Sequence, residues 1–260
     1  MEKLECSPAS FVLPSSVVQR HISKLGSTNT WAKQNAAILP KNVITLVTAD
    51  EQTAGRGRFQ RKWISPPCQN IYASFCFFLP KNVYAISNIP QILAIAASET
   101  LEKLGFKPKL KWPNDLLLSN KKVAGILCET TSLDDTLCFI AGIGLNVNMK
   151  PELLAEIDRP ATSLLSESGA EFDISKIIEL LQDNFVSHLQ LFFKEGLQPF
   201  LDKYRKRLLH SVGQKIQFYD NMIIWEGVYV GIREDGSLDL KMDNGEIKNF
   251  MAGEICHKVE

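Results

Sequence analysis

The chain has 260 residues, of which 45% are hydrophobic and 22% charged, and its 29 Lys and Arg balance 29 Asp and Glu, for a formal net charge of zero. At roughly 150 residues per domain, this length fits one large domain, or one large and one small, and buries a core without disulfide or metal staples. The neutral charge argues against a protein whose main task is to bind nucleic acid, because phosphate neutralisation usually leaves a basic surface.

The six cysteines and four histidines are scattered, and they form neither a CxxC pair nor a spacing typical of zinc ligands. This usage is typical of a reduced cytoplasmic protein with buried structural thiols. The first 16 residues contain no long apolar segment of the signal-peptide kind, and apolar runs such as 71–79 are far shorter than a membrane span. We therefore expect a cytoplasmic protein with no membrane association.

Up to about residue 150, apolar stretches of strand and helix character alternate with turn residues. A buried helix is expected at 90–104, because its length and apolar spacing fit and Gly105 can close it. A charged, glycine-rich loop is expected at 50–62. The remaining expectations are strands at 17–25, 43–48, 70–79, 109–112, 115–118, 123–130 and 137–147, a helix at 30–39 stopped by Pro40, a connection at 80–88 and a hairpin turn at 132–135.

The last third of the chain changes from helical patterns to short strands. Residues 173–195 repeat apolar side chains at helical spacing, with shorter helices expected at 162–168 and 197–209. Strands are then expected at 214–219, 223–232, 237–241 and 247–251, with Asp235-Gly236 and Asn244-Gly245 as hairpin turns. About 50 residues of this kind predict a small SH3-like β-barrel. We place a boundary near 210 and expect domains at 1–209 and 210–260.

The first candidate for chemistry is the loop from Gly55 to Trp63, GRGRFQRKW, which holds four cations within seven residues. Its glycines let backbone N–H groups approach a ligand, and arginine grips carboxylates and phosphates with two hydrogen bonds. The loop therefore suits an anion, although a solvated basic loop is common. Residues 54–62 have little apolar material to anchor them, and their like charges repel, so the backbone lacks a packing partner. We therefore expect this cationic loop to be mobile or disordered without a ligand and to become ordered when a ligand binds.

The second candidate is KWPND at 111–115, followed by Lys122. Pro113 forces a turn, and the Asn114 and Asp115 side chains suit a cation or a ribose hydroxyl. Lys122 begins the next strand and would point back toward that turn. An ordinary Asn-Asp hairpin explains these residues equally well.

Two further segments suit a ligand. Residues 142–148, GIGLNVN, end a strand with two glycines that permit close approach, although a lone GxG is weak. Ser27-Thr28-Asn29 precede a helix and are either simple capping residues or groups aimed at a small polar head group. The chain contains neither a GxxxxGK[ST] phosphate loop nor a GxSxG elbow, so a Ser-His-Asp hydrolase is disfavoured.

Read together and in this order, these segments resemble biotin–protein ligases. The family pattern is present as STN before a helix at 27–29, GRGRxxRxW at 55–63, KWPND at 111–115 with KxxGI at 122–126, and GIGxNVN at 142–148. The match runs from about residue 20 to the C-terminus, and the combination of GRGRxxRxW with KWPND is highly specific. The resemblance implies an α/β (α+β) fold, with a mixed-sheet catalytic domain and a small C-terminal SH3-like barrel.

The resemblance also implies a two-step reaction. Biotin and MgATP form biotinyl-5′-AMP and pyrophosphate, and a lysine of a biotin carboxyl carrier domain then takes the biotinyl group and releases AMP. The implied catalytic residues are Lys122, Arg58 and Asp115, with Asp115 placed near Mg²⁺ or the incoming lysine. The implied biotin site is Ser27, Thr28, Asn29, Gln52, Arg56, Gly57, Arg58 and Lys122. The implied ATP site is Arg58, Arg61, Trp63, Lys111, Asn114, Lys122 and Asn146.

Family members that also repress transcription carry an N-terminal winged helix-turn-helix. Only about 20 residues precede the first expected strand here, so we expect a ligase without specific DNA binding. Whether it forms a homodimer stays open. Two other functions remain: a lipoate or octanoate transferase of the same superfamily, which the GRGRxxRxW loop disfavours, and a non-enzymatic adapter that binds a peptide and an anion.

Overall fold

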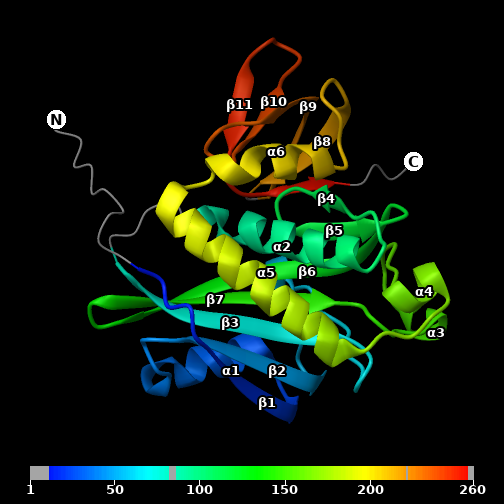
Figure 1. The fold of residues 1–260 in the computed structure, drawn as a ribbon. Coiled ribbons are helices and arrows are strands. Elements are labelled where there is room, and N and C mark those ends of the chain that lie inside the picture. The colour runs from blue at the N-terminus through cyan, green and yellow to red at the C-terminus, as the bar shows by residue number, and fades with distance from the viewer. Residues whose placement is uncertain (1–11, 82–85, 221, 257–260) are drawn as a thin grey trace.

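The computed structural model describes residues 12–81, 86–220 and 222–256, and it contains two β-sheets with helices packed on the larger one (Figure 1). The larger sheet has seven strands in the order β1-β2-β3-β7-β6-β5-β4. Only β1 and β2 pair in parallel, so the sheet is mixed, as expected. Its strands are β1 (Val17–Leu25), β2 (Ile44–Gln52), β3 (Ile71–Pro80), β4 (Lys109–Lys111), β5 (Asp115–Leu118), β6 (Lys121–Leu133) and β7 (Thr136–Leu145).

Helices cover both faces of this sheet because its central strands are apolar on both sides. Along β3, Phe75 and Phe77 face the core beneath helices α2 (Ile89–Lys103) and α5 (Ile174–Glu195). The alternate residues Cys76 and Phe78 face a smaller cluster under α1 (Thr28–Asn35). The other helices are α3 (Pro151–Leu154), α4 (Leu164–Ser168) and α6 (Gln198–Arg207), with 3₁₀ turns at 36–38, 58–60 and 86–88.

The smaller sheet is antiparallel and has five strands in the order β11-β10-β9-β8-β12, consistent with the expected small SH3-like barrel. Its strands are β8 (Lys215–Asp220), β9 (Ile223–Ile232), β10 (Leu238–Lys241), β11 (Ile247–Phe250) and β12 (Glu254–Cys256). One continuous apolar core includes residues of both sheets, with Trp112 5.7 Å from Phe218 between ring centroids. The division into domains at 1–209 and 210–260 stays a prediction.

The expected elements are largely confirmed, with four corrections. The helix at 30–39 is α1 from Thr28 followed by a 3₁₀ turn, and β2 runs on to Gln52, so 50–52 belong to a strand and not to the loop. The hairpin between β6 and β7 turns over residues 134–135 alone. The short elements α3 and β12 were not predicted. Part of the connection expected at 80–88, residue 221 within the expected barrel, and Cys6, one of the six cysteines, lie outside the described residues.

The thiols are less buried than expected. Cys76 and Cys138 are buried, Cys128 and Cys256 are half-buried, and Cys68 is exposed. All five are free. Within the ranges described, none of the helices is long and apolar enough to cross a membrane.

The barrel docks on the larger sheet through the Asp235-Gly236 turn. Asn88 Nδ2 donates to the Asp235 carbonyl at 2.8 Å, and Gln91 Nε2 and the Trp112 indole N–H donate to the Gly236 carbonyl at 2.7 and 3.1 Å. A Cβ on Gly236 would lie 2.4 Å from both Asn88 Nδ2 and Gln91 Oε1. The Asp235-Gly236 turn, which the sequence predicts as a hairpin, therefore also makes the contacts that hold the barrel beside the KWPND segment.

Replacing Gly236 with alanine should lower the free energy of unfolding by about 1–3 kcal/mol more than replacing Gly245, because only Gly236 is crowded. Both glycines sit in tight turns with similar backbones, φ +82° and +86°, so alanine strains both alike. Nothing lies within 4 Å of a Cβ on Gly245. Urea unfolding of the two variants measures the difference, and equal losses would show that the docking contact does not matter.

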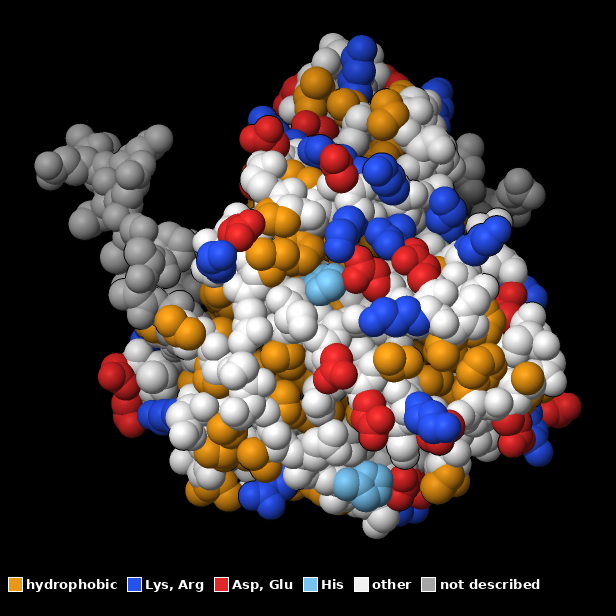
Figure 2. All heavy atoms as spheres, in the orientation of Figure 1, with side chains coloured by type: hydrophobic (Ala, Val, Ile, Leu, Met, Phe, Trp, Pro, Cys, Tyr) orange, Lys and Arg blue, Asp and Glu red, His pale blue; other side chains and the backbone are white. Residues whose placement is uncertain are grey.

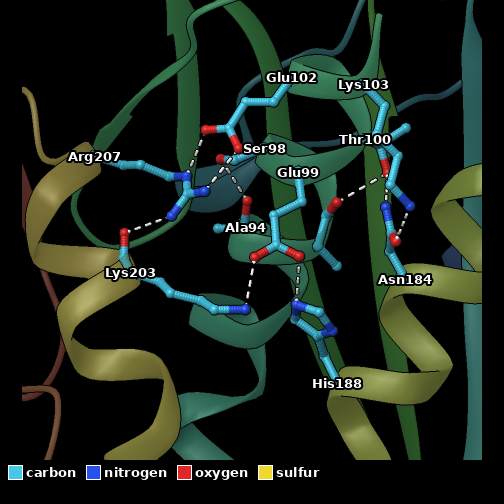
Figure 3. Close-up of polar contacts among 11 residues, drawn as sticks. Ala94, Ser98, Glu99, Thr100, Glu102, Lys103, Asn184, His188, Lys203 and Arg207 are labelled. Carbon is cyan, nitrogen blue, oxygen red and sulfur yellow. Dashed lines mark hydrogen bonds and ion pairs between the residues drawn. The ribbon is translucent and has the colours of Figure 1, made fainter.

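Ion pairs join the helices that cover the front face (Figure 3). Glu99 on α2 points between His188 of α5, at 2.8 Å, and Lys203 of α6, at 3.0 Å. Glu102 accepts two hydrogen bonds of 2.7 Å from Arg207 of α6. On this face Lys and Arg side chains gather in a band across the upper half of the view, with acidic side chains directly beside them (Figure 2).

The Glu99 contacts make stability depend on pH in acid. Hydrogen bonding to His188, followed by Lys203, lowers the pKa of Glu99 from 4.5 to about 2, against an opposing effect of burial. The folded state therefore binds this proton less readily than the unfolded one. The contribution is complete above pH 4.5 and is lost as pH falls toward 2. Glu99→Gln should flatten the fall in urea stability between pH 4.5 and 2, whereas Glu179→Gln, an exposed change on α5, should leave it as in the parent.

Candidate active site

A cavity of about 470 Å³ lies against the sheet, enclosed by the loop 56–64, the segment 156–161 and one residue of the barrel. It brings together all the residues predicted for a biotin site and all but one of those predicted for ATP. The predicted residues that line it are Ser27, Thr28, Asn29, Gln52, Arg56, Gly57, Arg58, Arg61, Trp63, Asn114, Asp115, Lys122 and Asn146. Lys111 lies instead on an adjoining cavity of about 440 Å³, which shares Asp115 and Lys122 with the first.

Neutral polar groups form one end of the cavity, where β1 turns into α1. Gln52 Oε1 accepts from the Thr28 N–H at 2.9 Å, and Gln52 Nε2 donates to Ser65 Oγ at 3.1 Å. Ser27 is the N-cap of α1, yet its side chain makes no capping hydrogen bond. The Ser27 hydroxyl and the second amide N–H of Gln52 are thus available to a neutral polar head group.

The glycines of β7 line the cavity, and they also lie against side chains of the chain itself, while the expected approach of a ligand to them stays a prediction. A Cβ on Gly142 would lie 2.2 Å from Asn29 Oδ1, and one on Gly144 would lie 2.4 Å from Trp63 Cε2. Asn29 donates to the Leu127 carbonyl and accepts from Ser74, so its amide is mostly committed to protein partners. The glycines therefore make room for the walls of the cavity.

Trp63 forms part of the cavity wall over the glycine strands. The Lys122 ammonium lies 5.5 Å from its ring centroid, a cation–π distance. Its indole N–H is buried and has no hydrogen-bond partner within the described part of the chain. An indole ring fixed beside a cation is suited to stack on a flat heteroaromatic group.

Lys122 is held by both its side chain and its backbone. Its Nζ lies 2.6 Å from Asp115 Oδ1, while its neighbour Lys121 is exposed. The backbone N–H of Lys122 donates to the Pro160 carbonyl at 2.9 Å, and the Thr162 N–H donates to the Lys122 carbonyl at 2.9 Å. The predicted direction of Lys122 toward the KWPND turn is confirmed.

The cationic loop has packing partners, so the premise that it lacks them is wrong, while its mobility without a ligand stays a prediction. Gly57 N–H donates to the Arg61 carbonyl at 2.7 Å, so the loop closes on itself. Arg61 Nη1 donates to Glu254 Oε2 at 2.5 Å, and the Phe59 ring meets Tyr219 of the barrel edge-on at 5.4 Å. Charge repulsion within the loop is offset by acidic and aromatic partners that are distant in sequence.

The cations around the two cavities differ in how far they are neutralised. Ion pairs join Arg56 to Glu129 at 3.5 Å, Arg61 to Glu254 at 2.5 Å and Lys122 to Asp115 at 2.6 Å. Three more cations of these cavities are buried or half-buried: Arg58, Arg159 and Lys111. Arg58 donates to the Asn114 amide oxygen at 3.0 Å, and Arg159 pairs with Asp158.

Arg58 and Lys111 differ from the other cations because neither forms an ion pair with a carboxylate in the described part of the chain. Among the described residues, no carboxylate lies within ion-pair distance of either, and Lys111 is only 4% exposed. Burial lowers the pKa of both groups from their ordinary values, and Asp115 and Glu254 partly oppose this. A buried cation without a carboxylate is stabilised by an anionic ligand, so this end of the cavity suits an anion.

The side chains around Asp115 do not form a metal centre of their own. One oxygen of Asp115 is engaged by Lys122, and no group of three or more His, Cys, Asp or Glu side chains across the described ranges could hold a metal ion. The donor set does not fit a resident metal ion.

Sequence reasoning missed two parts of the site. Glu254 lines both cavities from β12, and the segment 156–161 covers one side of the first. Neither carries a motif. Asn146, predicted near the nucleotide, donates its amide to the Thr162 carbonyl at 3.0 Å and so ties down the end of that segment. Only the fold brings these residues to the cavity.

A mixed sheet that carries a cavity lined by neutral polar groups and by cations has the form of a ligand-binding domain, and the lining suits a small molecule with an anionic terminus. The model of the biotin/lipoate A/B protein ligase family matches residues 22–146. The structure is similar to that of the biotin protein ligase from Aquifex aeolicus in complex with biotin and ATP. That similarity has a TM-score of 0.77 at 30% identity and covers 93% of this chain and 97% of the other.

Sequence relatives point to the same family as the structural similarity. The bifunctional ligase/repressor BirA of Bacillus subtilis is 30% identical over 263 residues, which cover 97% of this chain and 79% of that protein. BirA of Escherichia coli is 35% identical over 211 residues, so the match spans 64% of that relative's length. The biotin–[acetyl-CoA-carboxylase] ligase of Paracoccus denitrificans is 29% identical and covered to 92%. The chain belongs to the biotin protein ligase family.

Proposed function

We propose that this protein is a biotin–protein ligase. It joins biotin and ATP into biotinyl-5′-AMP and pyrophosphate, and it then transfers the biotinyl group to a lysine of a biotin carboxyl carrier domain. One observation carries the proposal: a single cavity of about 470 Å³ is lined by the neutral hydrogen-bonding groups of Ser27, Thr28 and Gln52 and by the cations Arg58 and Lys122, which contact Asn114 and Asp115. Biotin has the matching shape, with a neutral cyclic urea at one end and a carboxylate at the other.

In the first step the negatively charged biotin carboxylate must approach the negatively charged triphosphate of ATP, and nearby cations would reduce this repulsion. A biotin carboxylate oxygen attacks the α-phosphorus of ATP, the bond to the β-phosphate oxygen breaks, and pyrophosphate leaves with the electron pair. Arg58 and Lys122 both line the cavity, which supports a role for them where carboxylate and phosphate would meet; there they would lower the repulsion and stabilise the charge that develops. Trp63 would stack on the adenine, and Asn114, Arg61, Lys111 and Asn146 would surround the nucleotide. Mg²⁺ enters with ATP as part of that substrate.

The second step needs a neutral amine. The lysine ε-amine attacks the acyl carbon of biotinyl-5′-AMP, the bond from that carbon to the phosphate oxygen breaks, AMP leaves with the electron pair, and the nitrogen releases one proton to solvent water. In this step Lys122 would stabilise the departing phosphate, and Asp115, which Lys122 holds at 2.6 Å, would orient the incoming lysine. Ser27, Thr28, Gln52 and the backbone at Gly57 would hold the biotin head group throughout.

Mass spectrometry tests the proposal directly. The protein is incubated with ATP, Mg²⁺ and biotin, and we expect biotinyl-5′-AMP together with pyrophosphate release that requires biotin. A purified carrier domain added next should gain the mass of one biotinyl group on one lysine. If pyrophosphate release is absent or does not need biotin, the protein is not a ligase of this kind, and the adapter function becomes the better explanation.

A second candidate function is that of a lipoate or octanoate transferase, because the matched family includes lipoate protein ligases as well as biotin protein ligases. A thermal-shift assay with biotin, lipoate and octanoate, each with and without MgATP, separates the two. We expect biotin with ATP to raise the melting temperature most. A larger shift with lipoate or octanoate would assign the second function.

A further inference from the structure

A carboxylate outside the predicted site lies behind the neutral end of the cavity. Glu129, on β6, is 19% exposed in its side chain. Its Oε2 accepts from Asn29 Nδ2 at 3.0 Å and lies 3.5 Å from Arg56 Nη2. The same Arg56 nitrogen donates to Thr30 Oγ1 on α1 at 2.9 Å. One carboxylate thus holds two side chains that line the cavity.

We infer that Glu129 is a positioning residue that cancels the charge of Arg56 and thereby fixes which end of the cavity receives a carboxylate. The inference rests on the proposed function, since it concerns how biotin is oriented. The GRGR loop delivers two cations to one cavity, Arg56 near α1 and Arg58 near the β4–β5 turn. Only the first is paired with a carboxylate.

This pairing gives the cavity its polarity. With Arg56 paired to Glu129, the α1 end presents Ser27, Gln52 and Thr28 as neutral groups. The charge of Arg58, which Glu254 and Asp115 offset only from beyond ion-pair distance, stands at the other end. A ligand with one neutral and one anionic end then gains most in a single orientation. Without Glu129, both ends would carry a free guanidinium, and a carboxylate would be accepted at either.

The affinities of two ligands, measured by titration calorimetry, distinguish a cavity that accepts a carboxylate at one end from a cavity that accepts one at either end. Biotin has one carboxylate, whereas heptanedioate carries a carboxylate at each end of a similar chain and has no neutral head group. Glu129→Gln keeps the size and one hydrogen-bond acceptor but removes the charge. We expect biotin to bind about tenfold more weakly and heptanedioate about tenfold more tightly than in the parent protein. At saturating biotin and ATP, the rate of pyrophosphate release should stay within about twofold.

Two further variants separate charge from structure. Glu179→Gln, an exposed change on α5, should leave both affinities unchanged. Glu129→Gln combined with Arg56→Met removes the freed cation, so the gain for heptanedioate should disappear. If Glu129→Gln does not fold, Arg56→Met alone tests the pair from the other side. Biotin should then weaken while heptanedioate does not gain.

The possible results distinguish failure of the proposed function from failure of the inference about Glu129. If the parent protein does not bind biotin, the proposed function fails and the inference falls with it. If the parent binds biotin but Glu129→Gln leaves the ratio of biotin to heptanedioate affinity unchanged, only the inference is wrong. A uniform loss of affinity for both ligands would likewise show a merely structural role for Glu129.

Discussion

Lys122→Ala should slow biotin-dependent pyrophosphate release by about a hundredfold or more. In the proposed reaction, the change removes a cation from the point where the biotin carboxylate and the α-phosphate of ATP would meet. It also leaves the Asp115 carboxylate, 2.6 Å from the lost ammonium, to repel both anions. The rate is measured at saturating biotin and ATP, with unfolding in urea as a check that the variant still folds.

Lys121→Ala is the matched control for that experiment, because Lys121 is the exposed neighbour on the same strand. It should retain the parent rate. Adding Asp115→Asn to Lys122→Ala should recover part of the affinity for ATP, since the unpaired carboxylate is gone, but not the rate. Near-normal release from Lys122→Ala together with a loss in Lys121→Ala would overturn the assignment.

Gly144→Ala should lower kcat/KM for biotin and ATP by about tenfold to a hundredfold, the equivalent of the usual 1–3 kcal/mol of overpacking. The new Cβ would lie 2.4 Å from the Trp63 indole, so the ring must leave its place beside Lys122. Pyrophosphate release measures the loss. Gly26→Ala, where a Cβ meets nothing within 4 Å, is the control and should keep the parent kcat/KM.

A second change tests the cause of the Gly144→Ala defect. Trp63→Phe in the same chain exchanges the two-ring indole for a single ring and makes room for the methyl group. The double variant should therefore be more active than Gly144→Ala alone. If it is less active, the defect comes from the strand backbone and not from the displaced ring.

Several elements followed from the sequence because their causes are local. Helix α5 was predicted from its apolar spacing, and Asp173 caps it by accepting from the backbone N–H groups of Ser175 and Lys176. The β10–β11 turn followed from Asn244-Gly245, where Gly245 takes φ +86°. Such signals act within a few residues, so the chain alone determines them. The boundaries of short elements such as β12, with three residues, did not follow, because pairing with β8 decides them.

The sequence by itself also determined which segments carry chemistry, since STN, GRGRxxRxW and KWPND are specific patterns. Only the tertiary structure decided which of their charges are free. Arg61 meets Glu254 across 193 positions of sequence, and Arg56 meets Glu129 across 73. Arg58 donates to the neutral Asn114, and among the described residues no carboxylate lies within ion-pair distance of it, although Glu254 and Asp115 act on it from farther away. The physical reason is that the charge a ligand meets is the sum over partners brought close in space, and separation along the chain carries no information about that distance.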